Sequence, residues 1–283
     1  MNSITAMDSE YPQSLLDIQE PPPVLYYLGD LSLASRRCVA IVGSRKVSPY
    51  GSWAASSLAQ KLADHQVVVV SGMAVGVDTC AHKGSLLAKG KTIAVLGCGL
   101  DLCYPATNRG LKEQIAAQGL LLSEFPPGTP PLSFHFPRRN RIISGLAEST
   151  VIIEAGLSSG SLITAECAVE QGRNIYAVPG NINSAQSLGS NKLIRDGAIP
   201  LVVLDDLICD LGLKKEEAGK EELALLGREE RMLYLAVREH GELTGDLLCR
   251  KLNQSPSQIN ALVTVLEIKG FLQTEQGKIF IAK

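Results

Sequence analysis

The chain has 283 residues, of which 45% are hydrophobic, and its formal net charge at pH 7 is −2. This composition is typical of a globular protein of about two domains, and it excludes a protein that coats nucleic acid through its overall charge. The apolar stretches fall well short of the roughly 18 residues that cross a bilayer, and residues 1–10 lack a secretion signal, so we expect a cytoplasmic protein with no membrane contact.

The seven cysteines and four histidines are scattered along the chain, and no C-x-x-C pair occurs. An odd number of cysteines among apolar neighbours indicates reduced thiols rather than disulfides, and the dispersed histidines predict no metal site. No lysine of the P-loop type follows a glycine-rich segment, so neither ATP hydrolysis nor a bound cofactor is expected.

Residues 1–35 are expected to form an irregular N-terminal extension that packs on the core. Tyr11-Pro12 and the three prolines of residues 21–23 punctuate this segment, and a short apolar run at residues 24–27 follows them. Prolines at such spacing are typical of irregular backbone.

Residues 36–211 alternate between strand and helix signals. Short apolar runs end abruptly at glycine or an acidic residue in residues 39–43, 67–72, 93–97, 121–124, 151–154 and 176–180. Most of these runs are apolar throughout, as expected of strands that are buried on both faces of a parallel sheet. With helical patterns between them, they predict an α/β fold with a doubly wound, mostly parallel sheet of the Rossmann type, closed by a last strand at residues 200–204.

Residues 212–222 are rich in Lys, Glu, Ala and Gly, which predicts a charged linker. After it, residues 223–283 show three helical patterns and a hairpin around Gly277, which predicts a small winged-helix domain. Thr244 and Ser255 are expected to cap its second and third helices. The charges of Glu267 and Lys269 cancel on the third helix, which favours a packing or protein-interaction role over DNA readout.

Two glycine-containing turns of the α/β domain could position chemistry at the sheet edge. Gly43, Ser44 and Arg45 follow a strand directly, and a tight turn with a hydroxyl and a guanidinium suits a phosphate. Gly72 begins a second turn that contains Asp78, with His82 one helical turn later. We expect Asp78 to cap that helix and His82 to hydrogen-bond to it, rather than acid–base catalysis.

Residues 134–141 combine two phenylalanines, three arginines and an amide without one acidic side chain. Aromatic rings stack on bases and arginines contact phosphates, which is the combination that single-strand binders use. We therefore predict a basic loop that contacts nucleic acid, rather than a plain solvated loop. Its candidate binding residues are Phe136, Arg138, Arg139, Asn140 and Arg141.

Small hydroxyl residues precede the next helical pattern. Ser159, Gly160 and Ser161 would place hydroxyls and backbone N–H groups at a helix N-terminus, where an anion is accommodated. Glu154, before this turn, and Glu166, beyond it, allow an alternative. Their spacing is similar to the pattern of nucleotide phosphoribohydrolases, although Glu-Ala-Gly and Gly-Ser replace the glycine-rich elements of that pattern.

These motifs together resemble the DNA-processing protein A family, also called DprA or Smf. The resemblance covers the whole α/β domain. It is carried by Tyr11-Pro12, residues 41–45 (IVGSR), 71–78 (SGMAVGVD), 139–145 (RNRIISG), 159–161 (SGS), 178–180 (VPG) and 191–194 (NKLI). Many members of the family carry a helical module before the Tyr-Pro segment, and here only ten residues precede Tyr11.

The resemblance implies a Rossmann-like protein that binds single-stranded DNA without strong sequence preference. It also implies a homodimer that loads the RecA recombinase onto incoming DNA during natural transformation. The leading hypothesis is accordingly a DNA-binding mediator that is not an enzyme. The alternatives are a nucleotide N-glycosidase and a nucleotide sensor on the same fold.

Overall fold

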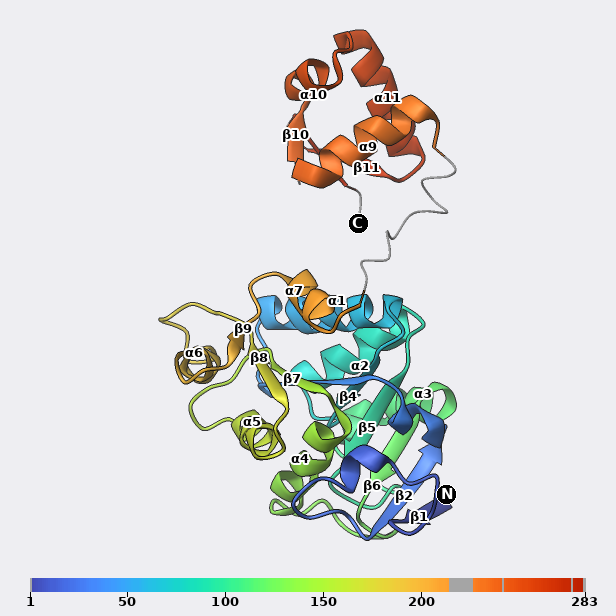
Figure 1. Cartoon of the computed structure of the whole chain (residues 1–283), viewed down its shortest axis with the longest axis vertical. Helices are drawn as coiled ribbons and strands as arrows, with labels where there is room; N and C mark the ends of the chain where they lie inside the picture. The colour runs from blue at the N-terminus through green and yellow to red at the C-terminus, as the bar shows by residue number, and fades with distance from the viewer. Residues whose placement is uncertain (1, 214–225, 241, 276, 282–283) are drawn as a thin grey trace. The chain divides into compact units, whose positions relative to one another are not determined.

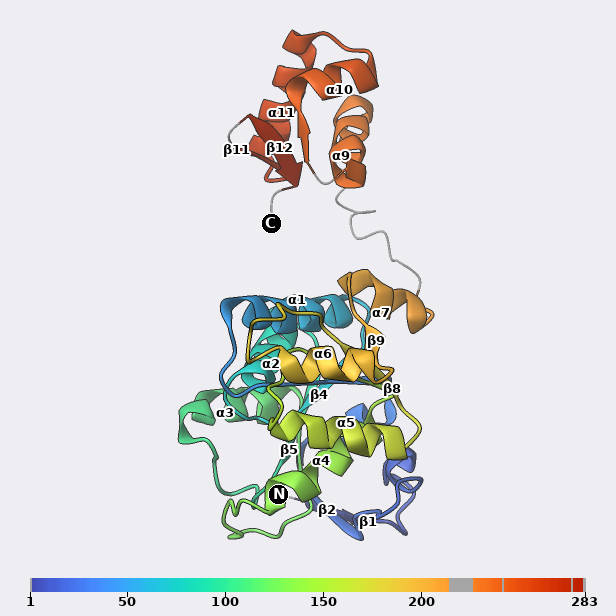
Figure 2. The same cartoon turned by 90° about the vertical axis from the view of Figure 1, so that its left-hand side faces the viewer.

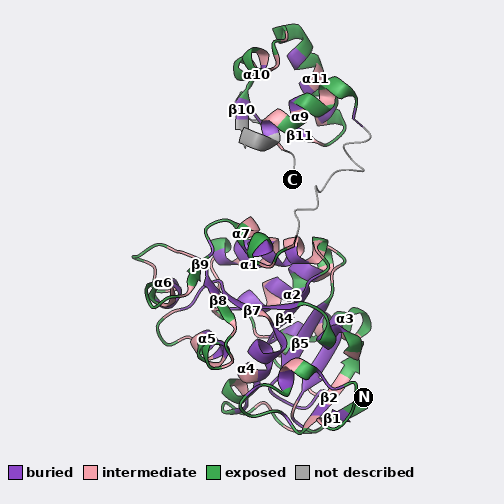
Figure 3. Ribbon diagram, viewed as in Figure 1, coloured by how far each residue is buried: buried purple, intermediate pink, exposed green. Residues whose placement is uncertain are grey.

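The structure is a computed structural model that describes residues 2–213, 226–240, 242–275 and 277–281. The chain divides into two compact units, Met1–Lys214 and Lys215–Lys283. Each unit has its own hydrophobic core, drawn in purple in Figure 3. The predicted linker at residues 212–222 lies outside the described residues apart from Gly212 and Leu213.

The first unit is built on a nine-stranded sheet with the order β1-β2-β6-β5-β4-β3-β7-β8-β9. Strands β3 to β9 run parallel, whereas β1 and β2 are antiparallel to their neighbours, which confirms the predicted mostly parallel sheet. The strands are β1 (Asn2–Thr5), β2 (Val24–Gly29), β3 (Cys38–Val42), β4 (Val68–Ser71), β5 (Thr92–Leu96), β6 (Leu120–Ser123), β7 (Ser149–Ile152), β8 (Asn174–Ala177) and β9 (Ile199–Pro200).

Helices cover both faces of this sheet, as Figures 1 and 2 show. The central strand β3 is buried along its whole length and sends alternate side chains into two cores. One core is shared with α1, α2 and α7, and the other with α4 and the N-terminal segment. The helices are α1 (Pro49–Asp64), α2 (Val77–Leu87), α3 (Arg109–Gln118), α4 (His135–Leu146), α5 (Gly160–Glu170), α6 (Leu188–Arg195) and α7 (Leu204–Asp210).

Two predictions about the edges of this sheet were wrong. The first 35 residues are not irregular throughout, because β1 and β2 extend the sheet and β2 pairs with β6. The predicted strand at residues 200–204 is shortened to β9, after which α7 begins at Leu204. Asp206 explains that start, since its carboxylate accepts a hydrogen bond from the Val203 N–H at 3.1 Å.

The connection order creates a switch point between β3 and β7. The chain passes from β3 to β4, β5 and β6 on one side, and then returns to β7 on the other side of β3. The segments that follow β3 and β7 therefore diverge and leave a crevice at the carboxyl edge of the sheet, where α/β proteins bind their ligands.

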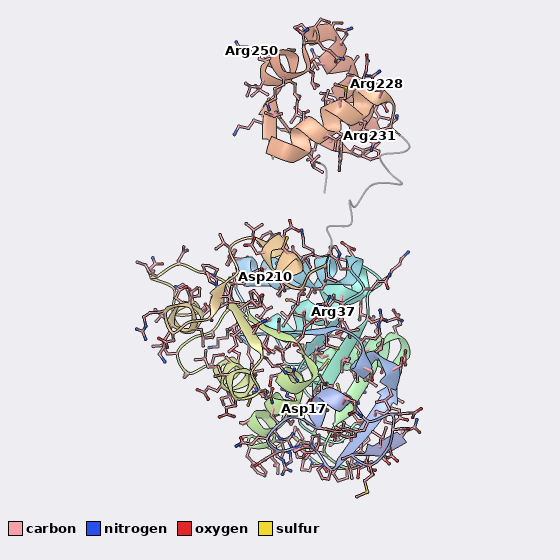
Figure 4. All side chains as sticks on the ribbon, in the orientation of Figure 1. Asp17, Arg37, Asp210, Arg228, Arg231 and Arg250 are labelled. Carbon is pink, nitrogen blue, oxygen red and sulfur yellow. The ribbon has the colours of Figure 1, made fainter. Side chains whose placement is uncertain are left out.

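The second unit has the predicted winged-helix elements. Its helices are α9 (Arg228–His240), α10 (Gly245–Leu252) and α11 (Pro256–Ile268), and its sheet has the order β10-β12-β11, with β10 (Glu242–Thr244), β11 (Leu272–Glu275) and β12 (Lys278–Ile281). Thr244 and Ser255 cap α10 and α11, as predicted. Strand β10 was not predicted. The arginines of this unit that Figure 4 labels, Arg228, Arg231 and Arg250, lie on α9 and α10 rather than on α11.

Candidate nucleic-acid interface

The crevice at the switch point is a cleft of about 690 Å³. It brings together residues from the turn after β3, from α4 and from the N-terminus of α5. The predicted site residues that line it are Gly43, Ser44, Arg45, Phe136, Arg139, Asn140, Ser159, Gly160 and Ser161. Gly72, Arg138 and Arg141, which were also predicted, are not among the lining residues. Lys46, Tyr104 and Gln186 also line the cleft, and they were absent from the predicted set.

The turn after β3 is rigid because its polar groups are satisfied internally. The Ser44 N–H donates to the Glu154 carbonyl at 2.7 Å, and the Ser44 hydroxyl donates to the Lys46 carbonyl at 3.1 Å. A Cβ on Gly43 would lie 2.7 Å from Val77, so this glycine serves the packing of α2 rather than the approach of a ligand. The Ser44 hydroxyl is thus not the free phosphate donor that we predicted, and Arg45 and Lys46 carry the charge of this turn.

The segment predicted as a basic loop is the helix α4, which begins at His135. Pro137 is compatible with this because the N–H groups of a first helical turn have no partner within the helix. The apolar spacing of Ile142, Ile143 and Leu146, which are all buried, could have revealed the helix. Since residues on a helix are about 100° apart, Arg138 and Arg141 lie on neighbouring positions of one helix face, whereas Arg139 points in a different direction.

Arg139 lies inside the protein, with only 4% of its surface exposed. Its guanidinium donates to the carbonyl of Gly72 at 2.7 Å and to the carbonyl of Val95, and its Nε donates to Asn140 Oδ1. Burial lowers the pKa of Arg139 to about 10, so it stays charged at neutral pH. A Cβ on Gly72 would collide with the guanidinium, which explains the glycine there. Arg139 therefore joins α4 to the ends of β4 and β5.

Arg138 and Arg141 are both paired with the Glu124 carboxylate, and Arg141 also lies 4.0 Å from the carboxylate of Glu20. Glu124, which follows β6, accepts from Arg138 Nη2 at 3.1 Å and from Arg141 Nη2 at 2.6 Å. Only 6% of the Glu124 side chain is exposed, against 56% of Arg138 and 12% of Arg141. The absence of acidic residues within residues 134–141 was therefore misleading, because the fold supplies the counter-charge from elsewhere in the sequence.

Arg45 lies over an aromatic wall. Its guanidinium carbon is 5.5 Å from the centre of the Phe136 ring, and the Tyr104 ring is 5.4 Å from the same ring. A cation over an aromatic face is attracted by the negative face of the ring, so Phe136 orients Arg45 toward the cleft. Among the residues that the structure describes, no carboxylate forms an ion pair with Arg45 or Lys46, and both are exposed.

The N-terminus of α5 forms the opposite wall. The Ser159 side chain caps the helix by accepting from the Ser161 N–H at 3.4 Å, and its hydroxyl lies 2.8 Å from the Ser161 hydroxyl. Asn140 donates to the Gly160 carbonyl at 3.2 Å, so its amide holds α4 against α5. The α5 N-terminus lines the cleft, so the positive end of its helix dipole adds to the charge of Arg45 there.

Asp78 and His82 do not form the pair that we predicted. Asp78 accepts from the N–H groups of Gly72 and Ala74, at 3.1 and 3.3 Å, and so fixes the turn before α2. His82 Nδ1 lies 2.7 Å from Thr92 Oγ1. Because the Thr92 hydroxyl donates to the Val69 carbonyl, the imidazole must be the donor to it. Burial, and to a lesser extent Arg139, lowers the pKa of His82 to about 3, which keeps the ring neutral.

The comparisons with known proteins agree with this geometry. A sequence model described as DNA recombination-mediator protein A matches residues 2–212. The chain belongs to this family. It is 46% identical over 196 residues to DNA processing protein DprA of Streptococcus pneumoniae, which covers 69% of each chain, and 41% identical over 212 residues to that of Bacillus subtilis, which covers 75% of this chain and 71% of the relative.

Solved structures of the family share the fold. The X-ray structure of DprA from Streptococcus pneumoniae superposes with a TM-score of 0.71 at 44% identity, covering 74% of this chain and 73% of that one. The structure of DNA processing protein A from Helicobacter pylori is described for its single-stranded DNA binding mode. It gives a TM-score of 0.68 at 32% identity, covering 75% of this chain and 96% of that one. The predicted resemblance and α/β fold are thus confirmed, and the chain is a DNA-processing protein of this recombination-mediator family.

The glutamates of the alternative hydrolase do not meet in the cleft. Glu154 is buried and accepts hydrogen bonds from the backbone and hydroxyl of Ser48, so it anchors the start of α1. Glu166 is exposed on α5 and does not line the cleft. No group of side chains suited to a metal ion occurs among the described residues, and no helix among them is long and apolar enough to cross a membrane.

Proposed function

We propose that this chain binds single-stranded DNA in the cleft between the β3 turn and α5, and that it acts on DNA by binding rather than by catalysis. The observation that carries the proposal is the position of Arg45. Its exposed guanidinium stacks on Phe136 and forms no ion pair with a carboxylate among the residues that the structure describes. It lies at the switch point of the sheet, in a family whose Helicobacter pylori member is described for binding single-stranded DNA.

A flexible single strand fits this cleft better than a duplex. Its backbone can bend into a crevice so that a phosphate meets Arg45 and the helix terminus of α5, while its unpaired bases reach aromatic side chains. The chain as a whole carries a charge of −2, so the attraction depends on the local cations of the cleft.

We further propose that the chain acts in the cytoplasm as a homodimer that delivers DNA to the RecA recombinase. Two clefts on one strand would raise the effective concentration of the second contact, so that modest contacts multiply into stable binding. Release of the strand from one cleft at a time would then expose part of the DNA to the recombinase.

Fluorescence anisotropy with matched single-stranded and double-stranded oligonucleotides tests this function. We expect preference for the single strand, and a salt dependence with a slope of about 0.7 per phosphate contacted. The variant Arg45→Ala should weaken binding about tenfold and reduce the slope by about 0.7. The control is Lys91→Ala, which removes a lysine before β5 at the opposite edge of the sheet. It should leave the affinity and the salt slope unchanged. Equal binding of Arg45→Ala and wild type would refute the assignment.

The hydrolase alternative has its own readout. Incubation with nucleoside monophosphates should release no free base, because neither Glu154 nor Glu166 faces the cleft with a free carboxylate. Steady release that disappears in Glu166→Gln would replace binding by N-glycosidic cleavage as the function.

A further inference from the structure

An aromatic pair lies exposed at the start of α1. Tyr50 is 47% exposed and Trp53, the single tryptophan of the chain, is 52% exposed. Their rings stack with centroids 6.1 Å apart and an angle of 28° between the planes. Exposing large aromatic side chains to water costs hydrophobic free energy. Two of them side by side on a surface therefore indicate a binding site for another molecule.

The pair is held in place by the end of the sheet. The Tyr50 hydroxyl donates to the Pro179 carbonyl, which follows β8, at 3.2 Å. Ser48, the N-cap of α1, is bonded through its own N–H to buried Glu154 at 2.9 Å. The first turn of α1 is thus fixed to the segments after β7 and β8. A platform fixed in this way costs little conformational entropy when a ligand stacks on it.

The aromatic pair is connected to the cleft through the turn after β3 and the segment after β8. Lys46 lines the cleft and precedes Tyr50 by four residues. Gln186, on the β8 side, also lines the cleft, and it donates to the Lys46 carbonyl at 2.8 Å. The segment after β8 therefore contacts both Lys46, a cation of the cleft, and Tyr50 of the aromatic pair. Exposed cations and rings that are close in the chain offer the combination of phosphate contacts and stacking surfaces that single-strand binders use.

We propose that a DNA strand leaving the cleft passes Lys46 and stacks its next bases on the Tyr50–Trp53 platform. This rests on the proposed single-strand binding and extends the site beyond the cleft. Base stacking tolerates every sequence, because each base has a flat π-face. The platform therefore lengthens the site without adding sequence preference, and its contribution depends on the length of the strand.

The single tryptophan makes the proposal directly measurable. A base stacked on Trp53 quenches the indole fluorescence, and no other tryptophan contributes to the signal. With the full chain we expect oligothymidylate of about 12 nucleotides to quench the emission strongly. A strand of about 4 nucleotides should quench it weakly, since it fills the cleft first.

Binding of the same two strands, measured by anisotropy, gives the second readout. Trp53→Leu and Tyr50→Leu keep apolar contacts and should weaken binding of the long strand about fivefold or more, and binding of the short strand by less than about twofold. Leu87→Ser changes another exposed apolar residue, 74% exposed, at the C-terminal end of α2 and is the control. Circular dichroism establishes that each variant is folded.

The outcomes separate this inference from the function on which it rests. If wild type binds neither strand, the proposed function fails and the platform fails with it. A second outcome overturns only the platform. In it, Arg45→Ala weakens the binding of both strands, but the long strand does not quench Trp53 fluorescence and binds Trp53→Leu as tightly as wild type. The platform is supported if the long strand quenches Trp53 fluorescence and if Trp53→Leu loses more affinity for the long strand than for the short one.

Discussion

Two cationic segments border the same cleft, and they use their charges differently. Helix α4 carries three arginines, but Arg138 and Arg141 are paired with Glu124 and Arg139 is buried in backbone contacts. The turn after β3 carries only Arg45 and Lys46, and both are exposed. The more basic segment in the sequence therefore supports the structure, and the less basic one presents charge to solvent. On the proposed function, binding depends on the charge left over after the fold has paired its own groups.

The strongest test of this contrast is the removal of Arg139. Arg139→Met leaves the carbonyls of Gly72 and Val95 without their donor in a buried site, so we expect a loss of about 2–4 kcal/mol in the free energy of unfolding. Urea denaturation measures it. Arg195→Ala, which removes an exposed arginine paired with Asp196, should change stability by less than about 0.5 kcal/mol. Unchanged stability of Arg139→Met would mean that α4 is not anchored by this residue.

The pH dependence of stability probes the same buried region. His82 has a pKa of about 3 in the folded protein against the usual 6.5, so between these values the unfolded chain binds the extra proton. Stability should therefore fall as the pH is lowered from about 6.5 toward 3, with a slope from this residue of up to about 1.4 kcal/mol per pH unit.

His82→Gln removes that titration. An amide can still donate to Thr92, and the melting temperature of this variant should fall less than that of wild type between pH 7 and pH 5. Parallel curves for the two proteins would show that His82 titrates normally.

The stacked geometry of Arg45 can be separated from its charge. Arg45→Lys keeps the charge but loses the planar group that lies over Phe136, and Phe136→Leu removes the ring. Each should weaken single-strand binding by about threefold to fivefold. Because both changes remove one interaction, the double variant should bind about as well as either single variant. Multiplicative losses in anisotropy titrations would show that the two residues act independently.

The smallest effect is expected for Arg138. Its guanidinium is already held in an ion pair by Glu124, so Arg138→Ala should change the dissociation constant for single-stranded DNA by less than about threefold and leave the salt slope nearly unaltered. The same titrations with Arg45→Ala provide the contrast. A larger loss in Arg138→Ala than in Arg45→Ala would reverse the comparison between the two segments.

Local patterns in the sequence were enough for the elements whose signal is contained in a few residues. The apolar runs from β3 to β7 are buried strands, as predicted, and Thr244 and Ser255 cap the helices that they were expected to cap. Ile259, Val263 and Leu266 lie at helical spacing on α11, and all three are buried in the core of the second unit. Such signals are reliable because a strand buried on both faces and a capped helix both follow from neighbouring residues.

The sequence by itself thus determined the α/β fold and placed Arg45 at the carboxyl edge of the sheet, because the order of strands dictates where their ends meet. Only the tertiary structure decided which cations remain unpaired. Glu124 reaches Arg138 and Arg141 from the segment after β6, and the carbonyls of Gly72 and Val95 accept from Arg139 at the ends of β4 and β5. Electrostatic partners are set by distances in space, and residues far apart in the sequence meet only after the sheet has formed.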